Sequence, residues 1–537
     1  APVVGGSKVV VEHTNINPNK AAHIGHLRNA VLGDVLARLL RALGSAVEVQ
    51  NYIDDTGVQL ADVVVGFRDL RGESAAGVAA LPEPFDFTCW DLYAEVGRWY
   101  GQDEGRLAHR RETLHALERG EGERAELGRL VARRVLARHL ATMARLGIGY
   151  DLLTHERAIL ALDFFAGAFE RLKQCGAVRL EESGKNAGCW VMPLAESEEF
   201  RGLEDPDKVI VRSDGTVTYV GKDIAYQLWK FGLLGRDFLY RRWDEAGVWQ
   251  TVAADGVEEH PAFGHGTRVI NVIDARQSYL QKIVRAGLEA LGYHEQAAAS
   301  IHFAYEMVSL SPATARQLGF LAAGEEPEGA LEMSGRKGIG VKADDLLDQL
   351  EAKSREEIAR RSRELPAGEL GALAREIAVA ALRFFMAKAS TTRLIAFDLD
   401  EALSFEGDSG PYLQYSLVRV KNIRRKLAAA GLPVEVAAAR LAKLPAAVWS
   451  DDLWDLALAV GQIPDKVRAA GETLEISLVA RHALELAQRF NAIYHQHPIL
   501  HEADPDLRDA RLGVTLVFAK GLATLCELLG IPVPERM

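Results

Sequence analysis

The chain has 537 residues, of which 48% are hydrophobic and 26% are charged, the balance of an ordinary globular protein. This length exceeds what one hydrophobic core organises, so we expect two or three domains. No run of about 18 apolar residues is present, and no basic segment leads into an apolar one, so we expect neither a membrane span nor a secretory signal. The cysteines are scattered without a CxxC pair, which argues against a zinc site or a disulfide framework and is typical of a reducing, cytoplasmic compartment: Cys89, Cys175, Cys189 and Cys526.

The net charge of −12 argues only weakly against a nucleic-acid partner. Binding depends on local patches of charge rather than on the total. One basic cluster lies between residues 419 and 426 and another between residues 133 and 138. A solvated charged face explains each of these clusters equally well.

Residues 9–53 form the first recognisable unit. A β-branched run at residues 9–11 is followed by an Asn- and Pro-rich turn, an amphipathic segment that ends at Gly44, and a second strand-like run at residues 46–53. His23, Gly25 and His26 stand where the helix begins. Such a junction offers free backbone N–H groups and the positive end of a helix dipole, so it favours phosphate binding. Two imidazoles and the nearby Lys20 add donors that would stabilise charge developing on a phosphate.

The rest of the chain divides into a mixed part and a helical part. Residues from about 62 to 205 are expected to form a mostly helical insertion, followed by a hairpin with strands at residues 208–211 and 216–220. Further strands are expected at residues 268–273 and 302–308, with a helix running to residue 291 between them. Residues 310–330 are rich in Ala, Gly, Glu and Pro and are expected to form a mobile excursion. After about residue 345 the pattern predicts helices alone.

Several segments in chain order resemble one known family. His23-Ile24-Gly25-His26 resembles the HIGH signature of class I aminoacyl-tRNA synthetases, and its surroundings resemble the arginyl-tRNA synthetase version. Residues 218–226 (TYVGKDIAY) are similar to that family's TYLTKDIAY block, residues 274–277 to its D-x-R-Q segment, and residues 333–338 (MSGRKG) to its MSTRKG loop, the family's form of KMSKS. The start of the family's anticodon-binding domain and its usual ending are matched by residues 398–407, 410–415 and 534–537.

This resemblance implies an α/β fold: a Rossmann-like, parallel-sheet catalytic domain over residues 1–365 with the inserted subdomain, and an all-helical anticodon-binding domain over residues 366–537. It implies an arginine–tRNA ligase that uses ATP, accompanied by Mg²⁺, to convert L-arginine to arginyl-adenylate and then charges the 3′-terminal ribose of arginine tRNA. We expect no tightly bound cofactor, no bound metal site and no membrane partner. We expect a monomer in the cytoplasm.

The resemblance assigns two sets of site residues. The catalytic and ATP-binding set comprises Lys20, His23, Gly25, His26, Met333, Ser334, Arg336 and Lys337. The arginine-binding set comprises Glu12, Asn17, Tyr219, Asp223 and Gln277. A planar guanidinium favours carboxylate partners, which suits Asp223 and Glu12. A helix N-cap is the competing interpretation for Asp223, and a structural salt bridge is the competing interpretation for Glu12.

Aromatic residues in the helical part are candidates for stacking on unpaired anticodon bases. The alignment with the family's segments nominates Tyr412, Tyr415 and Tyr494, and Met537 with them. An aromatic residue in a helical domain is more often part of the core, so that interpretation stays open.

Three features depart from the family pattern, one of which is that residues 310–330 lengthen the segment before the MSGRKG loop. The first strand begins about eight residues into the chain, so the family's N-terminal domain is expected to be absent. Glu332 stands where KMSKS has its first lysine, and we expect Lys20 to supply that charge. Because the N-terminal domain is expected to be absent, a catalytically silent tRNA-binding paralogue is the alternative, although the intact HxGH, Arg336 and Asp223 argue against it. A short nucleotidyltransferase with an HxGH motif would not need the helical domain.

Overall fold

The computed structural model describes residues 6–194, 200, 207–215, 217–244, 247–321, 340–361 and 366–537. Its centre is a seven-stranded sheet with the strand order β10-β9-β1-β2-β3-β8-β7. Every neighbouring pair is parallel except β7 and β8, which are antiparallel. The strands of this sheet are β1 (Lys8–Glu12), β2 (Ala46–Ile53), β3 (Leu152–His155), β7 (Leu239–Arg242), β8 (Trp249–Val252), β9 (Arg268–Asp274) and β10 (Ser300–Tyr305).

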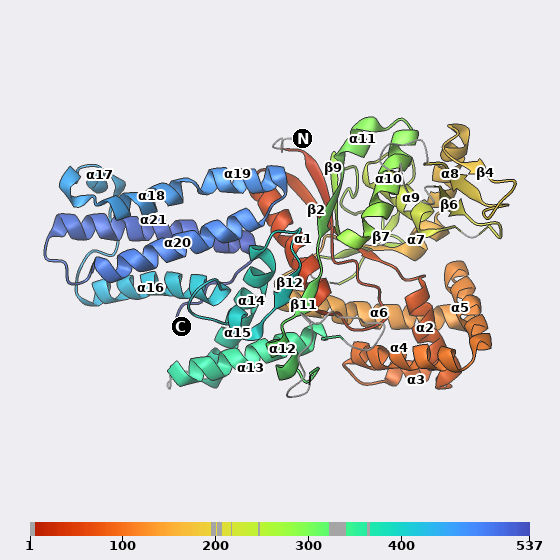
Figure 1. The fold of residues 1–537 in the computed structure, drawn as a ribbon, viewed down its shortest axis with the longest axis horizontal. Helices are drawn as coiled ribbons and strands as arrows, with labels where there is room; N and C mark the ends of the chain where they lie inside the picture. The colour runs from red at the N-terminus through yellow and green to blue at the C-terminus, as the bar shows by residue number, and fades with distance from the viewer. Residues whose placement is uncertain are drawn as a thin grey trace.

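Helix α1 (Ile24–Ala42) connects β1 to β2 and lies at the junction between the sheet and the C-terminal helices (Figure 1). Nearly all of its apolar side chains are buried, because it packs on the sheet on one side and on α13, α14, α19 and α21 on the other. The order strand, loop, helix, strand predicted for residues 9–53 is confirmed.

The region between β2 and β9 contains two helical groups and a small second sheet. The first group carries α2 (Val58–Val65), α3 (Ala75–Ala80), α4 (Phe85–Gln102), α5 (Leu107–Arg119) and α6 (Gly122–Arg145). The second carries α7 (Glu156–Ala161), α8 (Phe164–Gln174) and α9 (Tyr219–Lys230), with an antiparallel sheet of β4 (Arg179–Leu180), β5 (Trp190–Met192) and β6 (Lys208–Val211). Helices α10 (Ser278–Ala290) and α11 (His294–Ala299) join β9 to β10.

Three predictions in this region differ from the structure. The insertion expected from about residue 62 to 205 encloses β3, which pairs with β2 and β8 in the main sheet. The strand expected at residues 216–220 is wrong, since helix α9 already begins at Tyr219 with Thr218 at its N-cap. Only an isolated bridge between Val211 and Val217 remains of the expected hairpin. The polar segment after Thr218 buries its apolar face against α8 and α10, and this tertiary packing favours a helix.

The strand expected at residues 302–308 is divided in two. Strand β10 ends at Tyr305, and β11 (Val308–Leu310) belongs to a separate two-stranded parallel sheet with β12 (Ile395–Phe397). Helix α12 (Pro312–Gln317) occupies the start of the segment expected to form a mobile excursion, of which residues 322–330 lie outside the described part. β12 contradicts the expectation that no strand follows residue 345. A three-residue strand is too short to leave a periodic signal.

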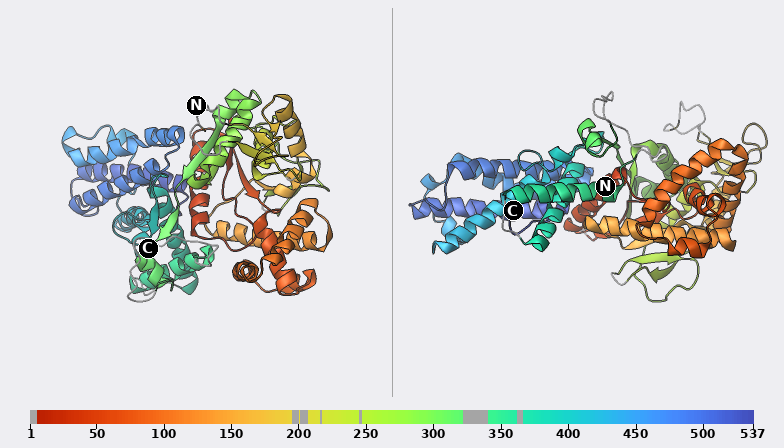
Figure 2. Two further views of the ribbon diagram at one scale, coloured as in Figure 1. Left: turned by 45° about the vertical axis from the view of Figure 1, so that its right-hand side comes forward. Right: turned by 90° about the horizontal axis from the view of Figure 1, so that it is seen from below.

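The C-terminal part is otherwise helical in the residues described. Its helices are α13 (Ala343–Arg361), α14 (Ala367–Lys388), α15 (Leu399–Ala402), α16 (Gly410–Ala429), α17 (Ala438–Leu441), α18 (Asp451–Gly461), α19 (Ile463–Thr473), α20 (Ser477–Gln496) and α21 (Pro505–Leu529). The later helices, α16 to α21, form an elongated bundle that extends away from the sheet (Figure 2). One hydrophobic core continues from the sheet through α1 into α14, α16, α20 and α21, so the bundle is packed directly onto the α/β part.

Helix α21 is long and apolar enough to cross a membrane by length and composition alone, the one such helix in the part of the chain described. However, 61% of its most apolar stretch is buried inside the molecule. It packs on α16, α18 and α20, and this packing accounts for its composition.

Candidate active site

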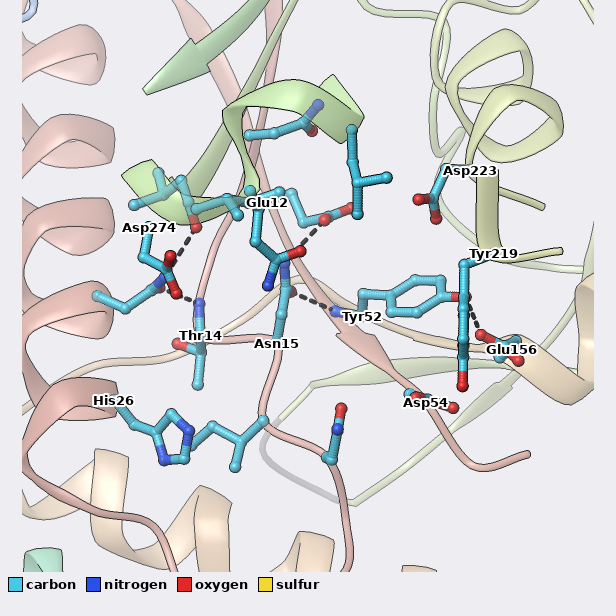
Figure 3. Close-up of a pocket in the computed structure, with 18 of the residues that line it drawn as sticks. Glu12, Thr14, Asn15, His26, Tyr52, Asp54, Glu156, Tyr219, Asp223 and Asp274 are labelled. Atoms are coloured by element: carbon cyan, nitrogen blue, oxygen red, sulfur yellow. Dashed lines mark hydrogen bonds between the residues drawn. The ribbon is translucent and has the colours of Figure 1, made fainter. Parts of the chain in front are cut away.

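A cavity of about 560 Å³ opens at the carboxyl ends of the parallel strands. Residues at or just beyond the ends of β1, β2 and β9 line it, namely Glu12, Asp54 and Asp274, together with the first turns of α1 and α9. Ligands of open α/β sheets bind at this edge, where the strand order reverses. Figure 3 shows His26 and Asp274 on one side of the cavity and Asp54, Glu156, Tyr219 and Asp223 on the other.

The two histidines of the HIGH segment cap helix α1. The Gly25 amide donates to His23 Nδ1 at 3.1 Å, and the His23 amide donates to His26 Nδ1 at 3.1 Å. The two rings stack with their centroids 3.6 Å apart. Because each Nδ1 accepts a hydrogen bond, a neutral ring carries its proton on Nε2 and can donate it to a ligand.

Both imidazoles are held neutral by their surroundings. Burial and the adjacent Lys20 lower the pKa of His23 to about 3. Burial and His23 lower the pKa of His26 well below its usual value. The pair therefore offers fixed hydrogen-bond donors rather than titrating positive charge near pH 7.

Gly25 and Lys20 complete this end of the cavity. A Cβ on Gly25 would lie 3.1 Å from Cε1 and 3.2 Å from Nδ1 of His23, so glycine is the residue that leaves the capping ring undisturbed. Lys20 is buried, and its Nζ lies 4.7 Å from the ring centroid of Trp90 and 4.8 Å from that of Tyr93. Two aromatic rings of helix α4 therefore hold the Lys20 ammonium in place. Among the predicted ATP-site residues that the structure describes, Lys20 carries the only full positive charge.

The remaining predicted ATP-site residues, Met333, Ser334, Arg336 and Lys337, lie outside the described residues, as does Glu332. The chain re-enters the described part beside α1. Lys342 forms an isolated β-bridge with His23, and the Ala343 amide donates to the Ala22 carbonyl at 2.8 Å. Lys342 and Ala343 therefore lie directly next to the HIGH segment.

Glu12 is buried at the opposite end of the cavity and is already paired. Its Oε2 lies 2.6 Å from Lys230 Nζ, and its Oε1 accepts a hydrogen bond from Asn15 Nδ2 at 2.8 Å. Lys230 itself is buried at the end of α9. The structural salt bridge considered for Glu12 is therefore present, although Glu12 still lines the cavity.

A second buried ion pair joins Glu156 to Lys222. Glu156 also accepts hydrogen bonds from Thr56 Oγ1 and, at 2.6 Å, from Tyr52 Oη. Burial and the Glu156 charge raise the pKa of Tyr52 well above its usual value, so the phenol stays protonated and donates. The Glu156 carboxylate is thereby fixed at the wall of the cavity.

Tyr219 and Asp223 lie one turn apart on α9, and both line the cavity. Asp223 is inside the helix, so the N-cap interpretation is wrong for it. Burial, Glu156 and Glu12 raise the pKa of Asp223 to about 7, against the opposing effect of Lys222 and Lys230. Asn17 and Gln277 also line the cavity, and Gln277 is exposed just before α10.

Sequence reasoning missed several residues of this cavity. Glu156 and Asp54 both immediately follow strands, β3 and β2, and a strand end was the signal that could have found them. Glu156 escaped because β3 was assigned to a helical insertion. Tyr52, Tyr226 and Lys230 also surround the acidic end.

Two of the residues predicted to bind tRNA, Tyr415 and Tyr494, lie on two helices beside one arginine, Arg419. Arg419 of α16 sits over the ring of Tyr415 at 4.4 Å and over that of Tyr494, on α20, at 5.0 Å. Tyr494 is 37% exposed, which leaves it open to a ligand. Tyr412 packs partly on the main core, and Met537 packs on a small cluster with Ile358 and Leu373, so both have structural contacts.

Known sequences and solved structures that resemble this chain indicate the class of protein to which it belongs. The family model described as "tRNA synthetases class I (R), catalytic domain" matches residues 4–235, and the "DALR anticodon binding domain" matches residues 413–537. Curated arginine–tRNA ligases from Thermococcus kodakarensis and Deinococcus radiodurans are each 37% identical over 99% of this chain, which covers 81% and 83% of those proteins. The solved arginyl-tRNA synthetase of Thermus thermophilus superposes with a TM-score of 0.83 at 34% identity, over 100% of this chain and 84% of that one.

The parallel sheet, the HIGH-capped helix at its carboxyl edge and the helical bundle define a class I aminoacyl-tRNA synthetase. Curated arginine–tRNA ligases are more than 30% identical to this chain over nearly its whole length. The chain belongs to the arginyl-tRNA synthetase family.

Proposed function

We propose that this chain is an arginine–tRNA ligase that activates L-arginine with ATP and transfers it to arginine tRNA. One observation carries the proposal: a single cavity has neutral, backbone-fixed imidazole donors at one end and a cluster of carboxylates at the other. The first end suits a phosphate group and the second suits a guanidinium.

In the activation step, the arginine carboxylate attacks the α-phosphorus of ATP. A new carboxyl-oxygen to phosphorus bond forms, the bond to the β-phosphate bridging oxygen breaks, and pyrophosphate leaves. The carboxylate is already ionised at neutral pH, so it needs no general base. Catalysis then depends on positioning and on stabilising charge at the phosphates. We assign the Nε2–H groups of His23 and His26 and the Lys20 ammonium to that role.

The loop residues Met333, Ser334, Arg336 and Lys337 are proposed to close on the phosphates from the other side. The return of the chain at Lys342 beside His23 supports this placement. Mg²⁺ is proposed to accompany ATP. No group of three His, Cys, Asp or Glu side chains in the described part is arranged to hold a metal ion, so phosphate oxygens and water would supply most of its ligands.

For the amino acid, we propose that Asp223 accepts hydrogen bonds from the guanidinium and that Tyr219 covers it. Asn17 and Gln277 are proposed to hold the α-amino end. Glu12 is proposed to act through Lys230, because their ion pair occupies its carboxylate.

For the second step, we propose transfer to the 2′-hydroxyl of the terminal ribose. Tyr415 and Tyr494 are the better stacking candidates for the anticodon, since Arg419 holds both and Tyr494 is exposed. Tyr412 and Met537 are weaker candidates because of their core contacts. We also propose a boundary between the catalytic and anticodon-binding domains near residue 365, and a monomer acting in the cytoplasm without a membrane partner.

The decisive experiment is ATP–pyrophosphate exchange with each amino acid in turn, with and without total tRNA. Exchange with arginine alone is the expected result. Absence of exchange under every condition, with tRNA binding retained, would instead identify a silent tRNA-binding paralogue.

A further inference from the structure

The acidic end of the cavity carries more negative charge than the cations around it balance. Four carboxylates line it: Glu12, Asp54, Glu156 and Asp223. Lys230 pairs with Glu12, and Lys222 pairs with Glu156. Both lysines are buried, and within the described residues neither Asp54 nor Asp223 forms an ion pair. Among the residues that the structure describes, Asp54 and Asp223 are therefore the two carboxyl groups of this end without an ion-pair partner.

Asp54 is held in a defined place at this end. It follows β2 directly, at the carboxyl edge of the sheet. Its Oδ1 is buried and accepts no hydrogen bond from the described part of the chain. A Cβ on Gly57 would collide with the Asp54 carboxylate, so the glycine leaves the space that this side chain occupies. Figure 3 shows Asp54 on the same side of the cavity as Glu156, Tyr219 and Asp223.

The groups around the two aspartates come from four elements. Asp54 interacts with Glu156 of α7, with Lys222 and Tyr219 of α9, with Tyr52 of β2 and with the neighbouring Asp55. Burial and Glu156 raise the pKa of Asp54 to about 8. Asp223 faces Glu156, Glu12, Lys222 and Lys230, and its pKa is also raised, as described above. Near pH 7 both carboxyl groups are partly protonated when no ligand is present.

We propose that Asp54 is a further carboxylate for the arginine side chain, acting with Asp223, and that arginine binding releases a proton from these two groups to solvent. This inference rests on the proposed function. A guanidinium keeps its own proton throughout, so the released proton comes from a carboxyl O–H, which becomes a carboxylate that accepts from a guanidinium N–H. Five donors in a planar fork can serve more than one carboxylate. A lysine ammonium lacks that fork, so Asp54 would also favour arginine over lysine.

Calorimetric titration of the full chain with L-arginine tests the proposal. At pH 7, heats measured in two buffers with different ionisation enthalpies give the number of protons exchanged. We expect release of about one proton per arginine, and a Kd that falls by up to about tenfold per unit as the pH rises from 6 to 8. Citrulline, the uncharged analogue, is expected to release no proton.

The variant Asp54→Asn sharpens the test. It is expected to reduce proton release at pH 7 by at least half and to weaken arginine binding about tenfold, with ATP binding unchanged. Asp91→Asn, at an exposed carboxylate of α4, is the matched control and should behave as the wild type.

The possible results test the proton release, the role of Asp54 and the proposed function separately. Arginine binding with no proton release in the wild type overturns the inference and leaves the proposed function intact. Unchanged affinity and unchanged proton release in Asp54→Asn overturn the role of Asp54. If Asp54→Asn does not fold, the wild-type pH series and the citrulline comparison decide alone. Failure of the wild type to bind arginine at any pH would contradict the proposed function itself.

Discussion

Single residues in this site act through the hydrogen bonds that fix them. His23 and His26 each use Nδ1 to accept a backbone amide, and this leaves each Nε2–H directed by the backbone rather than by side-chain torsions. Fixed donors need no reorganisation when charge develops on a phosphate. The HIGH tetrapeptide is thus both a helix cap and a donor array.

Replacement of Gly25 by alanine tests this dual role. The added Cβ would press on the His23 ring, displace the cap and turn the donors away. We expect the arginine-dependent exchange rate to fall by at least about tenfold, roughly 1.4 kcal/mol of transition-state stabilisation. The control is Gly97→Ala on α4, where a Cβ meets nothing within 4 Å. Equal rates for Gly25→Ala and the wild type would contradict the capping argument.

Replacement of Asp223 by asparagine tests the guanidinium site. The amide cannot form a charge-assisted fork with arginine, so binding should weaken by about 1.5–3 kcal/mol, or roughly ten- to a hundredfold. ATP binding should change by less than about twofold, because the histidine end of the cavity is untouched. Equilibrium titration of each ligand measures both, and equal losses for the two ligands would argue against the role of Asp223.

At the scale of elements, α1 links the site to the C-terminal bundle. Its Asp34 accepts a hydrogen bond from Arg38 at 2.7 Å and pairs with the fully buried Arg383 of α14. Arg383 also donates to the Leu529 carbonyl of α21 at 2.8 Å and to the Leu146 carbonyl at 3.0 Å. Burial alone would raise the pKa of Asp34, but the two guanidiniums lower it, so the carboxylate is ionised at neutral pH.

The substitution Arg383→Met is expected to destabilise the protein by about 3–5 kcal/mol, because it leaves Asp34 buried without its partner. Urea unfolding measures this loss, and the double variant Asp34→Asn with Arg383→Met should recover part of it. Arg285→Met removes an exposed pair with Glu289 on α10 and serves as the control with little expected change. A loss no larger than the control's would show that this link contributes nothing to stability.

At the scale of the whole molecule, buried histidines set a pH dependence of stability. Burial lowers the pKa values of His13 and His139 to about 4 and of His23 to about 3, and His26 shifts in the same direction. In the unfolded chain a histidine takes up a proton near pH 6.5. Below that pH the unfolded state binds more protons than the folded state, so stability falls as the pH drops from about 6.5 towards 4. The raised pKa values of Asp54 and Asp223 act in the opposite direction and offset part of this loss.

His139→Gln isolates one member of this group. The His139 Nε2 lies 2.7 Å from the Lys20 carbonyl, and a glutamine amide can still donate there. Removing the titrating ring should reduce the loss of stability between pH 7 and pH 5 by about 2 kcal/mol. Urea unfolding at the two pH values measures this, with the exposed His115→Gln as the control. Identical pH dependence in all three proteins would contradict the assignment.

The local features of this chain follow from the sequence itself. The order of strand, turn and helix at residues 9–53 depends on hydrophobic periodicity and capping, which act between near neighbours. His23, Gly25 and His26 are placed by that local order, so sequence reasoning located them correctly in the fold. The family resemblance assigned Tyr219 and Asp223 to one pocket, and both line the same cavity, although residues 216–220 were expected to form a strand rather than the start of their helix.

The charge arrangement of the site was decided only by tertiary structure. Glu12 at the end of β1 and Glu156 after β3 form ion pairs with Lys230 and Lys222 of helix α9, respectively. No local sequence pattern predicts ion pairs between residues so far apart in the chain. These partners occupy two of the four carboxylates, whereas Asp54 and Asp223 have no ion-pair partner in the described part of the chain. Which acid remains open depends on which strand ends the sheet brings together, and that pairing is set by long-range burial rather than by neighbouring residues.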